Sequence, residues 1–114
     1  LILALGAVVP PDGAPGVRIT MTDQLRFEPP EKTVEVGTTV RWENTSQLTH
    51  TVTCDPDLAT LEKSVHLPAG AEPFDSGRLQ PGDTFEYTFQ TKGTFTYFCQ
   101  PHEAAGMIGT VIVR

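Results

Sequence analysis

From Val17 onward, apolar and polar residues alternate with a period of two in a series of short segments. This period is typical of half-buried β-strands, in which successive side chains point to opposite faces of a sheet. Turn residues interrupt the series at frequent intervals, and Gly and Pro are prominent among them. The pattern predicts an all-β sandwich built from short strands. The strand-like segments are residues 17–21, 25–30, 33–36, 39–43, 50–54, 85–89, 95–99 and 107–113.

Residues 55–80 break this rhythm. A segment from Pro56 to Ser64 fits one or two helical turns, with Asp55 as the N-cap and Pro56 at the first helical position. No amphipathic helical pattern of useful length occurs elsewhere in the sequence. We therefore expect at most one short helix.

The run CQPHEAAGM at residues 99–107 carries the most specific chemistry of the chain. It places Cys99, His102 and Met107 in one short loop after a strand, and His50 comes from a distant strand. A thiolate, two imidazoles and a thioether form the ligand set of a mononuclear blue-copper site, in which Met is the weak axial ligand. The spacing C-x2-H-x4-M thus predicts one copper ion, cycling between Cu(I) and Cu(II), bound by these four residues.

Other metal sites fit the residue counts poorly. A structural zinc site usually takes four Cys or His ligands in C-x2-C pairs. A binuclear copper centre needs a second Cys in the ligand loop, and a multicopper oxidase needs more histidines than the three present. The sequence allows two interpretations each for Cys54 and His66. Cys54 is expected to be a buried free thiol, with a disulfide to Cys99 as the alternative. His66 is expected to be a loop histidine, and it takes a ligand role only if His50 has none.

The run CQPHEAAGM, the strand of His50 and further segments resemble the plastocyanin branch of the cupredoxins, and the resemblance extends over residues 17–113. The resemblance implies a Greek-key sandwich of about eight strands with copper at one end, and a one-electron shuttle between redox partners. It also implies that the ring edge of His102 is the electron port. The apolar patch around that port is expected to contain Leu48, Pro101, Ala104 and Ala105. The segments that carry the resemblance are residues 27–29, 34–44, the strand of His50, and residues 79–85 and 93–107.

Two residues, Thr51 and Asn44, are expected to surround the ligands without binding the metal. Plastocyanins usually carry Asn directly after the first ligand His, where this chain has Thr51. We therefore expect a changed hydrogen bond near Cys99 and an altered reduction potential.

The expected function is a blue-copper electron-transfer protein that makes and breaks no substrate bonds and is therefore not an enzyme. One alternative is a cupredoxin domain that serves as a fixed subunit of a larger membrane redox complex. Another is a copper-binding or delivery protein, which the presence of only two Met residues disfavours.

The expected partners are an electron donor and an electron acceptor, such as cytochromes or a membrane complex, and the protein is expected to be a monomer. A formal net charge of −6 argues against nucleic acid as a partner. The expected location is extracytoplasmic: the periplasm, the thylakoid lumen or the outer face of a membrane.

Residues 1–16 are interpreted as an N-terminal extension or linker, and residues 17–114 as the plastocyanin-like domain. The apolar run LILALGAVV at residues 1–9 is too short to span a bilayer. It fits the end of a signal or anchor segment that tethers the chain to a membrane, an extra strand, or a docking segment. The Pro- and Gly-rich residues 10–16 fit a linker or turn.

Overall fold

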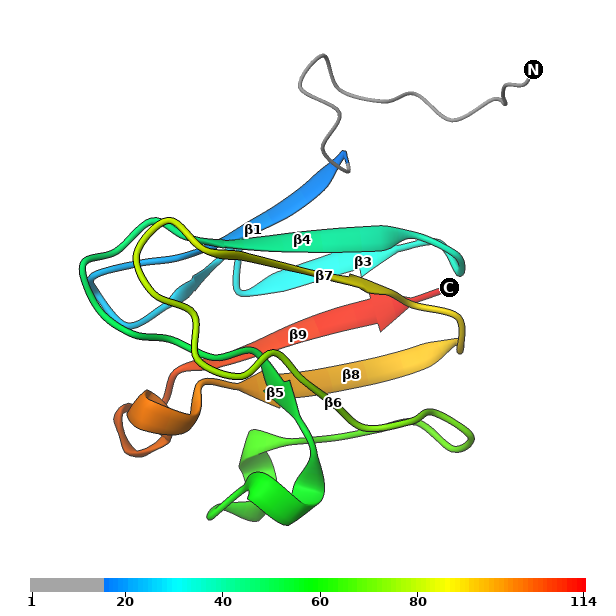
Figure 1. Cartoon of the computed structure of the whole chain (residues 1–114). Helices are drawn as coiled ribbons and strands as arrows, with labels where there is room; N and C mark the ends of the chain where they lie inside the picture. The colour runs from blue at the N-terminus through cyan, green and yellow to red at the C-terminus, as the bar shows by residue number, and fades with distance from the viewer. Residues whose placement is uncertain (1–15) are drawn as a thin grey trace.

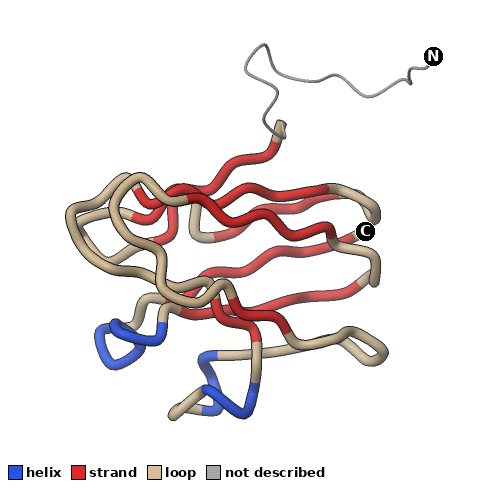
Figure 2. The backbone as a smooth tube through the Cα atoms, in the orientation of Figure 1, coloured by secondary structure: helices blue, strands red, loops and turns tan. Residues whose placement is uncertain are grey.

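The computed structural model describes residues 16–114, so the expectations for the first fifteen residues lie outside the described part. Two sheets face each other across one core (Figure 1, Figure 2). One sheet has the strand order β2-β1-β4-β7 and the other the order β3-β9-β8-β5-β6. The strands are β1 (Val17–Met21), β2 (Phe27–Glu28), β3 (Glu31–Val34), β4 (Thr39–Asn44), β5 (Thr53–Cys54), β6 (Phe74–Asp75), β7 (Thr84–Thr88), β8 (Gly93–Phe98) and β9 (Ile108–Val113).

The predicted all-β sandwich is confirmed, with nine strands in residues 16–114 where about eight were expected. The helical segments of this part of the chain are three short 3₁₀ helices, η2 (Pro56–Leu58), η3 (Glu62–Ser64) and η4 (Gln100–Ala105). The predicted start of η2 is confirmed, because the side chain of Asp55 accepts a hydrogen bond from the Asp57 N–H at 3.0 Å. The sequence pattern did not predict η4. No helix of residues 16–114 is long and apolar enough to cross a membrane.

Aromatic rings fill the core between the sheets. Trp42 is fully buried, and its ring centroid lies 5.4 Å from that of Tyr97 in an edge-to-face arrangement. Tyr97 in turn lies over Gly109, its partner across β8 and β9. A Cβ at Gly109 would come within 2.5 Å of the Tyr97 ring, so only glycine leaves room for that ring. The alternation of buried and less buried residues along β4 and β9 matches the sequence pattern.

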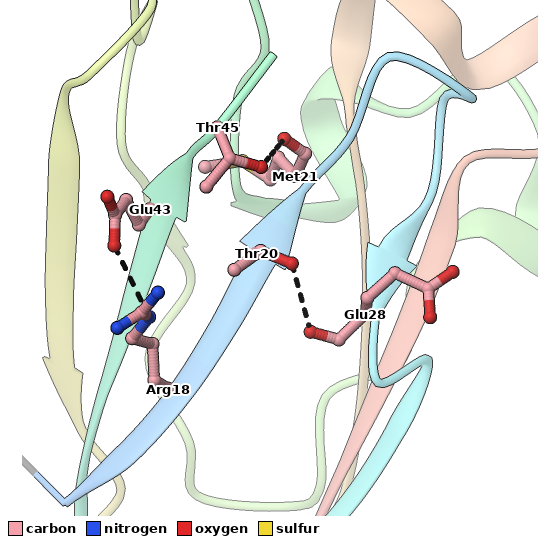
Figure 3. A network of polar contacts seen from close by, with 6 residues as sticks. All are labelled: Arg18, Thr20, Met21, Glu28, Glu43 and Thr45. Carbon is pink, nitrogen blue, oxygen red and sulfur yellow. Dashed lines mark hydrogen bonds and ion pairs between the residues drawn. The ribbon is translucent and has the colours of Figure 1, made fainter.

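Strand β1 lies between β2 and β4 and leads into the turn at residues 22–25 (Figure 1, Figure 3). Arg18 Nε and Glu43 Oε1 form an ion pair at 3.3 Å across β1 and β4, as Figure 3 shows. At the other end of β1, the Thr45 hydroxyl donates a hydrogen bond to the Met21 carbonyl at 3.2 Å. An exposed ion pair contributes little stability, so pairing with both neighbours is what holds this strand. The turn after β1, the β4–β5 connection and η4 all lie at one end of the sandwich, on the left in Figure 1.

Candidate metal centre

His50 lies in the connection between β4 and β5 and is fully buried. Its backbone forms a short bridge with Leu79, with hydrogen bonds of 3.0 and 2.7 Å in the two directions. The ring Nε2 lies 3.2 Å from the Thr22 carbonyl oxygen. Because a carbonyl only accepts, Nε2 carries the proton in this contact and Nδ1 keeps a free lone pair. The fold thus leaves the Nδ1 lone pair of His50 free to bind a metal.

Cys99 directly follows β8 and is fully buried. Its Sγ lies 3.5 Å from His50 Nδ1 and 3.4 Å from His102 Nδ1. The donor atoms of these three residues all lie within 4.8 Å of one another. The two imidazole rings meet at a centroid distance of 5.0 Å and an interplanar angle of 60°. The chain therefore brings one sulfur and two nitrogen donors to a single point.

Three backbone hydrogen bonds close the loop that carries Cys99, His102 and Met107. The N–H of His102 donates to the Cys99 carbonyl at 3.1 Å, and the N–H of Met107 donates to the His102 carbonyl at 3.3 Å. The Cys99 N–H donates to the Met107 carbonyl at 3.1 Å, which returns the chain to its starting point. Gly106 ends η4 with a φ of 81°, a left-handed conformation that glycine adopts readily. Met107 is 1% exposed and lies beside Cys99 along the backbone. The spacing C-x2-H-x4-M therefore corresponds to a loop whose two ends, Cys99 and Met107, are joined by a backbone hydrogen bond.

Burial shifts the pKa values of His50 and Cys99. Burial and the nearby His102 lower the pKa of His50, which favours the neutral imidazole. Burial raises the pKa of the Cys99 thiol, against hydrogen bonds from Thr51 and His102 that lower it. A bound cation displaces a thiol proton, and sulfur, imidazole and thioether donors suit copper. The donor set therefore fits a copper ion.

The structure gives the two predicted supporting residues different roles. The Thr51 N–H donates to Cys99 Sγ at 3.4 Å, and the Thr51 hydroxyl accepts from the Gln100 N–H at 2.9 Å, so Thr51 touches the site. Asn44 instead holds the loop in front of His50. Its Nδ2 donates to the carbonyls of Leu48 and Leu79 at 2.7 and 2.9 Å. Its Oδ1 accepts from the N–H and the hydroxyl of the nearby Ser46, so the role of Asn44 is to brace this loop.

Two supporting groups escaped the sequence reasoning. The first is the Thr22 carbonyl, which orients His50 and is a backbone group that no side-chain motif reveals. The second is Glu103, which lies inside the ligand loop and is 7% exposed. Its carboxylate accepts from the N–H of Thr60 at 3.0 and 3.1 Å and from the N–H of Leu61 at 2.8 Å. A charged residue within the predicted ligand loop could have indicated a structural role. The sequence could not name its partners, because they lie 42 and 43 positions away.

The remaining cysteine and histidine, Cys54 and His66, lie outside the donor cluster. Cys54 is a buried free thiol, as expected, and its Sγ lies 3.4 Å from the Thr96 carbonyl. His66 pairs with the backbone of Thr96 through two hydrogen bonds of 3.0 Å. In the described part of the chain the clustered donors are those of His50, Cys99 and His102, without His66.

Of the residues expected around the electron port, all four are exposed, and His102 itself is half-buried. Leu48 has 40% of its surface exposed, which is high for a large apolar side chain. The exposed members of this set are Leu48, Pro101, Ala104 and Ala105.

A model of the family of copper binding proteins, plastocyanin/azurin family, matches residues 16–114. The chain belongs to this family. It is similar to a plastocyanin of Scenedesmus fuscus, with 35% identity over 94 residues that cover 79% of this chain and 88% of that protein. It covers a smaller share, 56–59%, of several chloroplastic plastocyanins.

Two solved structures share the fold. A purple cupredoxin from Nitrosopumilus maritimus superposes with a TM-score of 0.66 at 25% identity, covering 86% of this chain and 99% of that one. A reduced proline-to-phenylalanine mutant of amicyanin superposes with a TM-score of 0.68 at 27% identity, covering 90% of this chain and 84% of that one. Together with the clustered donors, these matches confirm the predictions of a plastocyanin-like cupredoxin, one copper ion and a blue-copper electron-transfer function.

Proposed function

We propose that this protein carries single electrons between redox partners through a copper ion held by His50 Nδ1, Cys99 Sγ, His102 Nδ1 and Met107. One observation carries the proposal: a buried cysteine sulfur lies 3.4 and 3.5 Å from the Nδ1 atoms of two histidines. When bound at such a site, copper supplies a reversible one-electron Cu(I)/Cu(II) couple.

The residues of this chain hold the donor atoms in place with little freedom. The Thr22 carbonyl orients the His50 ring, and the Thr51 N–H holds Cys99 Sγ. The closed loop after β8 fixes His102 relative to Cys99. A rigid frame of this kind limits the rearrangement of ligands that accompanies each electron transfer, and contacts around the ligands tune the reduction potential.

We place the entry and exit of electrons at His102, because it is half-buried while His50 and Cys99 are fully buried. The exposed Pro101, Ala104 and Ala105 of the same loop, together with Leu48, offer an apolar surface around it. A small surface of this kind suits a partner that binds weakly and dissociates quickly. The proposed partners are an electron donor and an electron acceptor protein, and the protein acts as a monomer.

The burial of the ligands supports a carrier over a copper-delivery protein. Delivery requires ligands that a partner can reach and exchange, whereas His50 and Cys99 are 0% exposed. We therefore propose that the protein transfers electrons and catalyses no bond chemistry of its own. The similarity to chloroplastic plastocyanins supports an extracytoplasmic location.

A copper titration of the metal-free protein tests the proposal, followed by visible absorption and EPR spectroscopy of the oxidised form. We expect one copper per chain, an intense thiolate-to-copper absorption band and a narrow copper hyperfine splitting. The variant Cys99→Ser should lose the band. The matched control Cys54→Ser should keep it, because Cys54 lies outside the donor cluster. A colourless copper complex of the unmodified protein, or a band that survives in Cys99→Ser, would refute the proposal.

A further inference from the structure

A line of hydrogen bonds leads away from the donor cluster through Thr51 to Thr53 on β5 and Asp75 on β6. The Gln100 N–H, next to Cys99 in the chain, donates to Thr51 Oγ1 at 2.9 Å. Thr51 Oγ1 lies 2.8 Å from Thr53 Oγ1, and Thr53 Oγ1 donates to Asp75 Oδ1 on β6 at 2.7 Å. Thr51 is 2% exposed and Thr53 is 0% exposed, so water does not compete freely for these hydroxyls.

The chemistry of the groups fixes the direction of every bond in this line. An ionised carboxylate only accepts, so Asp75 takes the single proton of the Thr53 hydroxyl. The Thr53 oxygen must then accept the proton of the Thr51 hydroxyl across the 2.8 Å contact. The Thr51 oxygen in turn accepts from the Gln100 N–H. The Thr51 hydroxyl proton therefore points toward Thr53.

We propose that Thr53 and Asp75 are positioning residues that hold the Thr51 hydroxyl proton away from Cys99 Sγ and so keep the reduction potential of the site low. The inference rests on the proposed function. Thr51 gives the sulfur one backbone hydrogen bond at 3.4 Å, and the line prevents it from giving a second one through its hydroxyl.

The Thr51 hydroxyl belongs to the residue whose backbone N–H already contacts the sulfur, at 3.4 Å. The hydroxyl oxygen of Thr51 also lies 2.9 Å from the N–H of Gln100, the residue that follows Cys99 in the chain. If Thr53 no longer accepts, the Thr51 proton is left without a partner in a buried site, and the cysteine sulfur is an available acceptor. A hydrogen bond to a ligand sulfur withdraws electron density from it, which favours the reduced form of the site and raises the potential.

Reduction potentials and visible spectra of copper-loaded variants test the inference. Thr53→Val removes the acceptor, and Asp75→Asn adds an amide donor that lets the line reverse its direction. Both variants should raise the reduction potential and shift the thiolate-to-copper band to higher energy. Thr53→Ser, which restores the hydroxyl, should return both values to those of the unmodified protein.

The control is Thr88→Val, which breaks another hydroxyl pair, Thr39 Oγ1 to Thr88 Oγ1 at 2.7 Å, in the other sheet. It should lower the unfolding midpoint of the metal-free protein less than Thr53→Val, because Thr53 is fully buried and loses two hydrogen bonds, and it should leave the potential unchanged. Asp75 is exposed, so Asp75→Asn should not disturb the core. Its reduction potential therefore tests the inference even if Thr53→Val, at a buried position, fails to fold.

A double-mutant comparison isolates the freed proton. In a Thr51→Val background there is no hydroxyl to turn toward Cys99, so adding Thr53→Val should cause no further rise in potential. The inference is overturned if copper-loaded, blue Thr53→Val and Thr88→Val have equal reduction potentials. It is also overturned if Thr53→Val raises the potential as much in the Thr51→Val background as in the unmodified protein. A copper complex of the unmodified protein without the thiolate band would instead overturn the proposed function.

Discussion

The Glu103 carboxylate clamps the ligand loop to the segment before η3, and its removal gives a direct test of this role. The carboxylate accepts from the Thr60 N–H through both oxygens, at 3.1 and 3.0 Å, and from the Leu61 N–H at 2.8 Å. A hydrogen bond to a charged group contributes about 1.5–3 kcal/mol. Thr60 and Leu61 are themselves exposed, so water can replace part of this bonding once the carboxylate is gone.

We therefore expect Glu103→Ala to lower the free energy of unfolding by about 2 kcal/mol, less than the sum of two such bonds. Glu103→Gln keeps one accepting oxygen and should cost about 1 kcal/mol. The metal-free protein suits the assay, because bound metal would add its own stabilisation to every variant. Urea unfolding followed by the fluorescence of Trp42, the single and fully buried tryptophan, reports the change. Each kcal/mol should also lower the melting temperature by about 4 °C.

The matched control is Glu62→Ala, which removes an exposed carboxylate from the adjacent η3. A surface change of this kind should stay within about 0.5 kcal/mol. All variants should keep the same denaturant dependence, since only then does a shifted midpoint measure stability. If Glu103→Ala were no less stable than Glu62→Ala, the carboxylate would not be the clamp, and the loop would be held by its backbone bonds alone.

Two further predictions concern the core. Gly109→Ala should lower the free energy of unfolding by about 1–3 kcal/mol in the same urea assay, because a Cβ there displaces the ring of Tyr97; a neutral result would show that the ring has room to move. Burial, with Asp55 nearby, raises the pKa of Cys54 from 9.0 to about 12, so its protonated form stabilises the fold fully below pH 9 and this contribution is lost as the pH rises from 9 to 12. Between these values the free energy of unfolding should fall more steeply in the unmodified protein than in Cys54→Ala, by up to about 1.4 kcal/mol per pH unit, and parallel curves would contradict the assignment.

Local patterns in the sequence were sufficient for the fold class and for the three residues whose donor atoms cluster, His50, Cys99 and His102. Alternation of apolar and polar residues depends only on the geometry of a strand, so β4 and β9 could be predicted without knowing their neighbours. The ligand loop was predictable for a similar reason, because the backbone bonds that close it join residues 99–107 to one another. Strand β6 was not predicted, because it has two residues, too few to show a period, and lies within residues 55–80, where the alternation breaks. It accounts for the one strand beyond the expected eight.

The environment of the donors was decided by the tertiary structure alone. His50 owes its orientation to the carbonyl of Thr22, 28 residues away, and Thr51 meets Gln100 across 49 residues. Glu103 finds its partners in a segment that the sequence assigned only to helical turns. These contacts use backbone groups that every residue except proline possesses, so no residue type marks them in advance. Which N–H or carbonyl is free to serve the site depends on strand register and on where the chain turns, and both are settled only when the two sheets pack together.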